Sequence, residues 1–166
     1  MNNTISGKIA LRGLLIALAF VLSWVEMQIP YFFTIPSIKL GLTNLVVLIA
    51  LYKLSSADAF ILNIVRILLV SFTFGNMTAL MYSLAGGILS LLTMYLLKCY
   101  TKSSVKFVSV MGGITHNIGQ LIVAAVILNS AHVFWYLPYL WISGILAGII
   151  IGLISDLVLK KLPNQR

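Results

Sequence analysis

The sequence predicts an all-α, polytopic membrane protein, a six-helix bundle formed by a single transmembrane domain over residues 1–166. Of the 166 residues, 61% are apolar and only 8% are charged, whereas a soluble domain carries about a quarter charged residues. The apolar runs are long and continuous, unlike the strands of a membrane β-barrel, which alternate over about ten residues. A bilayer core of about 30 Å needs about 20 apolar helical residues per crossing. Six runs come near that length: 9 to 29, 40 to 54, 58 to 74, 76 to 98, 107 to 129 and 134 to 158.

The first three runs differ in length and in their flanking residues. Residues 9 to 29 continue past the short apolar core of a secretory signal and show no small-residue cleavage site before Ile29, so we expect a retained span. The second and third runs are the shortest, and Lys53 lies in the connection between them. A stretch of that length crosses a bilayer only where the helix is tilted or broken.

The fourth and sixth runs contain small residues at close spacing. The fourth holds Gly86 and Gly87, and the sixth repeats Gly144, Gly148 and Gly152 at four-residue intervals. Small residues let helices approach closely in lipid, where no hydrophobic effect drives their association. These stripes are therefore expected to be docking surfaces, either for another helix of the chain or for another protein.

The distribution of Lys and Arg predicts the orientation of the bundle. One side of the predicted topology carries only Lys39, and Arg66 falls inside the third run. By the positive-inside rule, both termini are expected to be cytoplasmic in a multi-pass protein of the cell membrane. The nine other basic residues lie on the side of the termini: Lys8, Arg12, Lys53, Lys98, Lys102, Lys106, Lys160, Lys161 and Arg166.

Composition and motifs also exclude several functions. The short connections leave no room for a soluble catalytic domain, and the sequence lacks the G-x-x-x-x-G-K-[ST] loop that cradles phosphates, so the chain is not expected to be an enzyme. No cofactor or metal is expected, because neither Cys nor a carboxylate accompanies His116 at ligand spacing. The single Cys99 cannot form an internal disulfide. The expected surroundings are the lipid bilayer, with no nucleic-acid partner.

Arg66 is the most informative residue inside a predicted span. A cation at that depth costs at least about 2.5–3.5 kcal/mol on insertion scales and usually faces a cavity or an anion. Asp58 lies eight residues earlier on the same helix, about 12 Å away at about 1.5 Å per residue. Two roles are therefore open for Arg66: a structural bridge to Glu26 or contact with backbone carbonyls, and binding of a ligand carboxylate or phosphate.

The fifth run carries a polar face within GGITHNIGQ, residues 112 to 120. His116 and Gln120 are one helical turn apart, and Asn117 lies on the same flank as Gln120. Burying these three side chains in lipid carries a large desolvation cost. They are expected either to contact a ligand in a pocket or to form hydrogen bonds between helices.

The segment of residues 29 to 44 is expected to face outward. Two prolines prevent a regular helix there, and three aromatic residues form either a lid over a pocket or an interfacial belt. Lys39 would lie at the mouth of such a pocket, and Asn44 follows it at the start of the second run. Both are candidate ligand contacts.

The order of these motifs resembles a known family. KLGLTN, NIVRILLVSFTFGN, SLAGGILSLLTMYLLK, GGITHNIGQLIVAA and YLPYLWISGILAG follow one another, as in the heptaprenyl diphosphate synthase component I family, also called Gx transporter. That family is similar in size and six-helix layout to the substrate-binding S components of energy-coupling factor (ECF) transporters. The resemblance implies an outward-facing ligand pocket and a first helix that docks on a transmembrane coupling subunit bound to two ATPase subunits. Gly13 and Ala17 match the small-residue docking pattern, with Gly in place of the usual first Ala.

The synthase label of that family requires a separate test. Long-chain prenyl synthases hold Mg²⁺ and a diphosphate with clustered aspartates, because hard cations demand several oxygen ligands. The three acids of this chain, Glu26, Asp58 and Asp156, are isolated from one another in the sequence. We therefore expect no catalysis by this chain alone.

Three functions remain for comparison. The first is the S component of an ECF-type importer for a small, anionic, vitamin- or cofactor-like molecule. The second is a noncatalytic membrane accessory subunit of a long-chain prenyl diphosphate synthase. The third is a proton-linked carrier that uses His116. This third function is the least supported, because no intramembrane carboxylate pairs with that residue.

Overall fold

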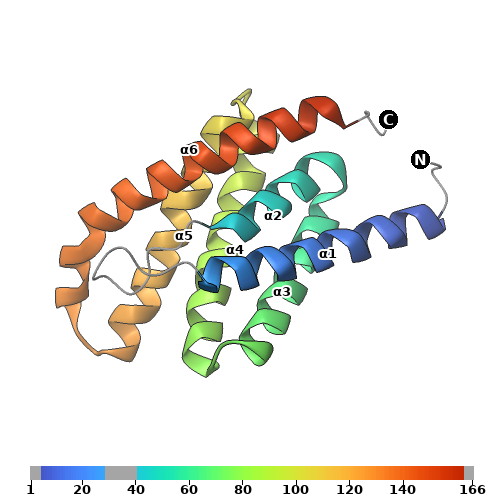
Figure 1. Cartoon of the computed structure of the whole chain (residues 1–166). Helices are drawn as coiled ribbons and strands as arrows, with labels where there is room; N and C mark the ends of the chain where they lie inside the picture. The colour runs from blue at the N-terminus through green and yellow to red at the C-terminus, as the bar shows by residue number, and fades with distance from the viewer. Residues whose placement is uncertain (1–4, 29–40, 163–166) are drawn as a thin grey trace.

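Long helices cross one another in the computed structural model, which describes residues 5–28 and 41–162 (Figure 1). All regular elements in those two ranges are helical, as the sequence predicts. They are α1 (Ile5–Gln28), α2 (Leu42–Lys53), α3 (Ser56–Thr73), α4 (Met77–Tyr100), α5 (Val105–Ile127), the 3-10 helix η1 (Ala131–Tyr136) and α6 (Leu137–Lys161).

Five of the described helical stretches are long and apolar enough to cross a membrane. The exception is α2, which has 12 residues and therefore a length of about 18 Å at about 1.5 Å per residue. The second run is thus a short apolar helix, in agreement with its place among the shortest runs of the sequence. The protein is a multi-pass α-helical membrane protein in which one short helix lies inside the bundle.

Local capping explains why several helices begin away from their predicted bounds. Ser55 accepts from the Asp58 backbone N–H at 3.0 Å and donates its own N–H to the Asp58 carboxylate at 3.3 Å, a capping box that starts α3 two residues early. Asn76 caps α4 in the same way through Ala79 N–H at 2.8 Å. The sixth run begins as η1, and α6 itself begins at Leu137 with Pro138 in its first turn, where a missing N–H costs nothing.

The short helix α2 forms the centre of the apolar core. Its residues 46 to 51 are all buried, and it contacts α1, α3, α4 and α6. In Figure 1 it lies between α1 and α6, with α3 and α4 crossing beneath. Because its neighbours cover it on all sides, α2 has no face for lipid, which explains its nearly uniform apolar sequence.

Glycines bring α5 into backbone contact with both of its neighbours. A Cβ added to Gly113 would lie 2.5 Å from the carbonyl oxygen of Gly144 on α6, and one added to Gly119 would lie 2.7 Å from the carbonyl oxygen of Ala85 on α4. Gly148 would likewise meet Val110 Cα at 2.6 Å. The glycine stripe of the sixth run is therefore a docking surface within the chain, in agreement with the role of small residues in membrane bundles.

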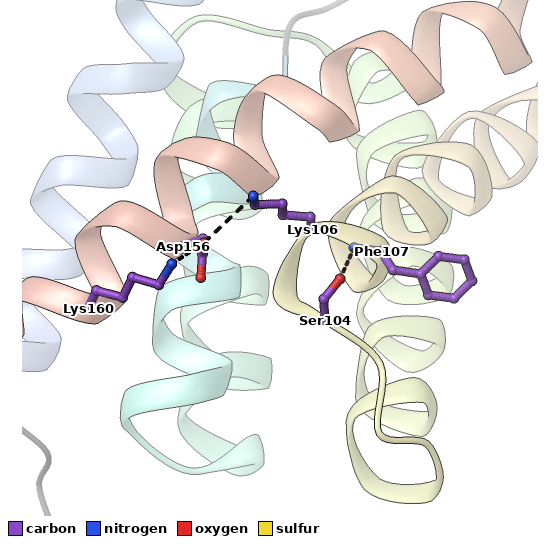
Figure 2. A network of polar contacts seen from close by, with 5 residues as sticks. All are labelled: Ser104, Lys106, Phe107, Asp156 and Lys160. Carbon is purple, nitrogen blue, oxygen red and sulfur yellow. Dashed lines mark hydrogen bonds and ion pairs between the residues drawn. The ribbon is translucent and has the colours of Figure 1, made fainter.

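Ion pairs join neighbouring helices in the first half of α1 and near the end of α6. Asp156 on α6 lies between Lys160 of the same helix, at 2.9 Å, and Lys106 of α5, at 3.9 Å (Figure 2). Arg12 on α1 pairs with Asp58 on α3 at 2.7 Å. These pairs connect α5 to α6 and α1 to α3.

Candidate functional site

Arg66 on α3 is buried among neutral side-chain oxygens. Its Nε and one terminal nitrogen donate to Asn63 Oδ1 at 3.1 and 2.8 Å. The remaining bonds reach the start of α2, where Thr43 Oγ1 accepts at 2.5 Å and Asn44 Oδ1 accepts at 3.3 Å. Arg66 therefore joins α3 to the first turn of α2 through two of its four hydrogen bonds, and the other two stay within α3.

Glu26 is near enough for its charge to act on the Arg66 guanidinium. No ion pair within 4.0 Å joins these two residues among those that the structure describes. Instead, a carboxylate oxygen of Glu26 accepts from the backbone N–H of Gly41. Gly41 has φ +69°, a left-handed conformation that glycine adopts without steric cost. Glu26 therefore holds the turn that leads into α2, beside the Arg66 network.

A polar cavity of about 30 Å³ lies between α2, α4, α5 and α6. Asn44 connects it to the Arg66 network, because its Oδ1 accepts from Arg66 while the residue also lines the cavity. Arg66 itself is not among the described lining residues. These are Gly41, Asn44, Ser90, Met94, Ser109, Gly112, Gly113, His116, Asn117, Gln120, Gly144, Ala147, Gly148 and Ile151.

Glycines line this cavity at points where neighbouring groups approach the helix backbone closely. A Cβ added to Gly112 would lie 2.7 Å from Met94 Sδ and 3.2 Å from Ser90 Oγ, and one added to Gly144 would lie 3.1 Å from Asn117 Nδ2. Side chains at these positions would fill the cavity or displace its polar groups. The close packing of the groups that line the cavity therefore requires glycine at these positions.

The polar face of α5 points into the cavity, where the structure brings its three predicted residues together. Asn117 Nδ2 donates to the carbonyl oxygen of Leu140 on α6 at 2.7 Å. Gln120 Nε2 lies 3.2 Å from His116 Nε2 and donates to it, because an amide nitrogen has only hydrogens to offer. One bond crosses to another helix and one stays within α5, so the predicted hydrogen bonding between helices occurs at Asn117.

Two buried polar atoms of the cavity, Ser90 Oγ and Gln120 Oε1, have no hydrogen-bond partner among the residues that the structure describes. Ser90 is 1% exposed and Gln120 is 8% exposed, so bulk water does not satisfy them. A buried polar group without a partner costs about 1–3 kcal/mol. A cavity of this size has room for about two water molecules or a small polar group, and such an occupant would satisfy both atoms.

Other predicted residues lie apart from the cavity. Lys39 and the aromatic residues of 29 to 40 fall outside the described residues. Gly13 and Ala17 lie on the exposed side of α1, and a Cβ added to Gly13 would meet no atom within 4 Å. Gly13 therefore contributes to no close helix contact among the described residues, in contrast to the glycines of α5 and α6.

Four polar residues of the network and cavity are not among the residues that the sequence predicts for the site. Thr43 and Asn63 bind Arg66, while Ser90 and Ser109 line the cavity. Asn63 lies three residues before Arg66, a spacing that places two side chains on one helix face. That spacing was the available signal for Asn63, whereas single Ser and Thr residues are common in membrane helices and gave none.

The fold and the cavity define a class: a multi-pass α-helical membrane protein with a small cavity, lined in part by polar side chains, between its helices. The family model for heptaprenyl diphosphate synthase component I matches residues 15–158. The chain belongs to this family, as the order of its motifs predicts. Comparison with curated proteins and with solved structures gave no match.

Proposed function

We propose that the protein is the membrane-embedded, noncatalytic substrate-binding subunit of an ATP-driven importer of the ECF type. The observation that carries the proposal is the polar cavity inside the bundle, in which Ser90 Oγ and Gln120 Oε1 are buried without partners. Membrane proteins rarely leave such groups unsatisfied, because lipid offers them no hydrogen bonds. A small polar molecule in the cavity would supply those bonds.

The positions of the acids support a noncatalytic role. Glu26 binds the Gly41 backbone, Asp58 pairs with Arg12, and Asp156 pairs with Lys160. These three are the only Asp or Glu residues in the sequence, and none lines the cavity in the described residues. A diphosphate-bound Mg²⁺ requires several oxygen ligands together, which this set of acids does not provide.

An importer subunit of this kind needs partners, which we propose to be a transmembrane coupling subunit and two ATPase subunits. The exposed side of α1, with Gly13 and Ala17, is the surface proposed for docking, because small residues allow a close approach between helices. In this proposal the protein lies in the cell membrane with both termini in the cytoplasm. The basic residues Lys160 and Lys161 at the end of α6 agree with that orientation.

The family's name favours a second candidate function. A noncatalytic membrane component of a long-chain prenyl diphosphate synthase would use the apolar helix surfaces for an isoprenoid tail and a soluble partner for catalysis. The two proposals differ in the proteins that bind the chain. They also differ in whether the cavity holds a retained small molecule.

Native mass spectrometry of the complex purified in mild detergent from its own host distinguishes these functions. A coupling subunit with two ATPases, or a retained small molecule, supports the importer proposal. A stoichiometric prenyl synthase subunit without ATPases supports the second function and contradicts the first.

A pair of variants tests the proposed docking surface in the same experiment. Ala17→Leu would hinder a partner helix on α1, whereas Ala131→Leu makes the same change at an exposed alanine of η1. We expect partner subunits to be lost from the first variant and kept by the second. Retention of the partner by both variants would exclude this side of α1 as the docking surface.

A further inference from the structure

The three carboxamide side chains of the cavity each have one end engaged within the protein. Asn44 Oδ1 accepts from Arg66, Asn117 Nδ2 donates to Leu140 O, and Gln120 Nε2 donates to His116 Nε2. A carboxamide has one acceptor oxygen and one donor nitrogen. The engaged ends of Asn44 and Asn117 leave the Asn44 nitrogen and the Asn117 oxygen available, and Gln120 Oε1 is buried without a partner among the described residues.

The bonds of Arg66 fix this pattern from outside the cavity. Because the guanidinium only donates, it requires the oxygen of Asn44, and the nitrogen of that amide turns away from Arg66. The Asn44 nitrogen lies 3.3 Å from the position of a Cβ added to Gly41, which also lines the cavity. Arg66 thus acts as a positioning residue for the donor of Asn44. Its own hydrogen bonds go to neutral side-chain oxygens.

The available groups are complementary to a neutral amide. On α5, Asn117 and Gln120 offer acceptor oxygens three residues apart, and Gln120 Oε1 is unpartnered. Asn44 offers a donor from α2, and the unpartnered hydroxyl of Ser90 on α4 both donates and accepts. A ligand edge that presents an N–H beside a C=O satisfies both kinds of group, whereas a carboxylate has no hydrogen for the two acceptor oxygens.

Resting on the function proposed above, we infer that the cavity recognises a neutral amide edge, either a carboxamide or a cyclic amide, and discriminates against the corresponding carboxylate. The cavity volume of about 30 Å³ admits a group of two or three non-hydrogen atoms, the size of an amide. The recognised group enters the cavity, and the remainder of the ligand lies outside it. This inference replaces the anionic ligand that Arg66 suggested in the sequence, because Arg66 is bound to protein oxygens and does not line the cavity.

Benzamide and benzoate provide a matched pair of probes, with the same ring and shape and with an amide or a carboxylate at one end. Their binding to the full chain, purified in detergent at pH 7, is measured by saturation-transfer NMR titration. Gln120→Leu removes the acceptor in the cavity, and Gln28→Leu makes the same change at an exposed position of α1. A probe that partitions into the micelle contributes equally to the titrations of both variants. The difference between the two titrations therefore measures binding that depends on Gln120.

We expect benzamide to bind the wild type and Gln28→Leu alike and to lose at least tenfold in affinity with Gln120→Leu. Benzoate should show no difference among the three proteins. Ser90→Ala is a second variant, which removes only one hydroxyl group. It should lower benzamide affinity about two- to tenfold, the contribution of one hydrogen bond. It should not lower the thermal stability of the empty protein. Ser90 Oγ has no partner to lose in the structure.

Benzoate binding that requires Gln120 would overturn the amide inference in favour of an anion. Absence of any Gln120-dependent binding of benzamide would overturn it as well. The proposed function is judged separately, by the retained small molecule and the subunits seen in native mass spectrometry. A retained carboxylate together with ATPases would leave the importer proposal standing while this inference fails.

Discussion

Two glycines of the bundle give a direct test of how closely its helices pack. Gly113→Ala places a Cβ 2.5 Å from the carbonyl oxygen of Gly144, and the obstructing atom is helix backbone. Gly13→Ala makes the same substitution on α1, where nothing lies within 4 Å. Both changes replace glycine by alanine inside a helix, so the gain in helix propensity is common to them and cancels in the comparison.

The magnitudes follow from two opposing terms. Alanine in a helix interior is favoured over glycine by about 0.8–1 kcal/mol, and overpacking a close contact costs about 1–3 kcal/mol. Because the backbone of α6 cannot rotate away as a side chain does, we expect the upper part of that range for Gly113→Ala. Its net loss should be about 2 kcal/mol, whereas Gly13→Ala should gain up to about 1 kcal/mol.

Reversible unfolding in mixed micelles, with the fraction of SDS as the denaturant and far-UV circular dichroism as the readout, measures both free energies. The two variants should differ by about 3 kcal/mol, in opposite directions from the wild type. Equal stabilities for the two variants would refute the backbone contact between α5 and α6. A loss of stability with Gly13→Ala would show that α1 packs against another part of the chain at that position.

Three further predictions concern the polar groups. Arg66→Ala should lower the free energy of unfolding by about 1–3 kcal/mol, because it leaves the buried oxygens of its partners without donors; unchanged stability in the same SDS titration would contradict the network. Asn76→Ala should cost about 1 kcal/mol through loss of the α4 cap, and a control at exposed Gln28 should cost nothing measurable. Asp156→Asn should lower stability by no more than about 1 kcal/mol, because its partner Lys160 is largely exposed. That loss should shrink as salt is raised from low to physiological concentration, and a salt-independent loss would indicate that the pair is buried.

The sequence by itself determined the fold class and much of the local structure. Composition and long apolar runs required helices in a membrane, since a backbone in lipid must satisfy its own hydrogen bonds. The order of the motifs predicted the family whose model matches residues 15–158. The four-residue spacing of Gly144, Gly148 and Gly152 predicted a docking stripe, and the structure places that stripe against α5.

Only the tertiary structure decided what the polar residues contact. The sequence left open whether Arg66 pairs with Glu26 or with a ligand. In the structure its hydrogen bonds go to Thr43, Asn44 and Asn63. Two of these three residues lie on α2, more than 20 positions away in the chain. Periodicity within one helix does not predict a contact between residues so far apart in the sequence, because that contact depends on how two helices cross.

The cavity was beyond sequence reasoning for the same physical reason. The spacing of His116, Asn117 and Gln120 placed three polar groups on one face of α5, but a face becomes a cavity only where neighbouring helices stand apart. Here α2, α4 and α6 each contribute lining residues. Helical periodicity is a local property that the order of residues determines, whereas the space between helices depends on side chains from several segments at once.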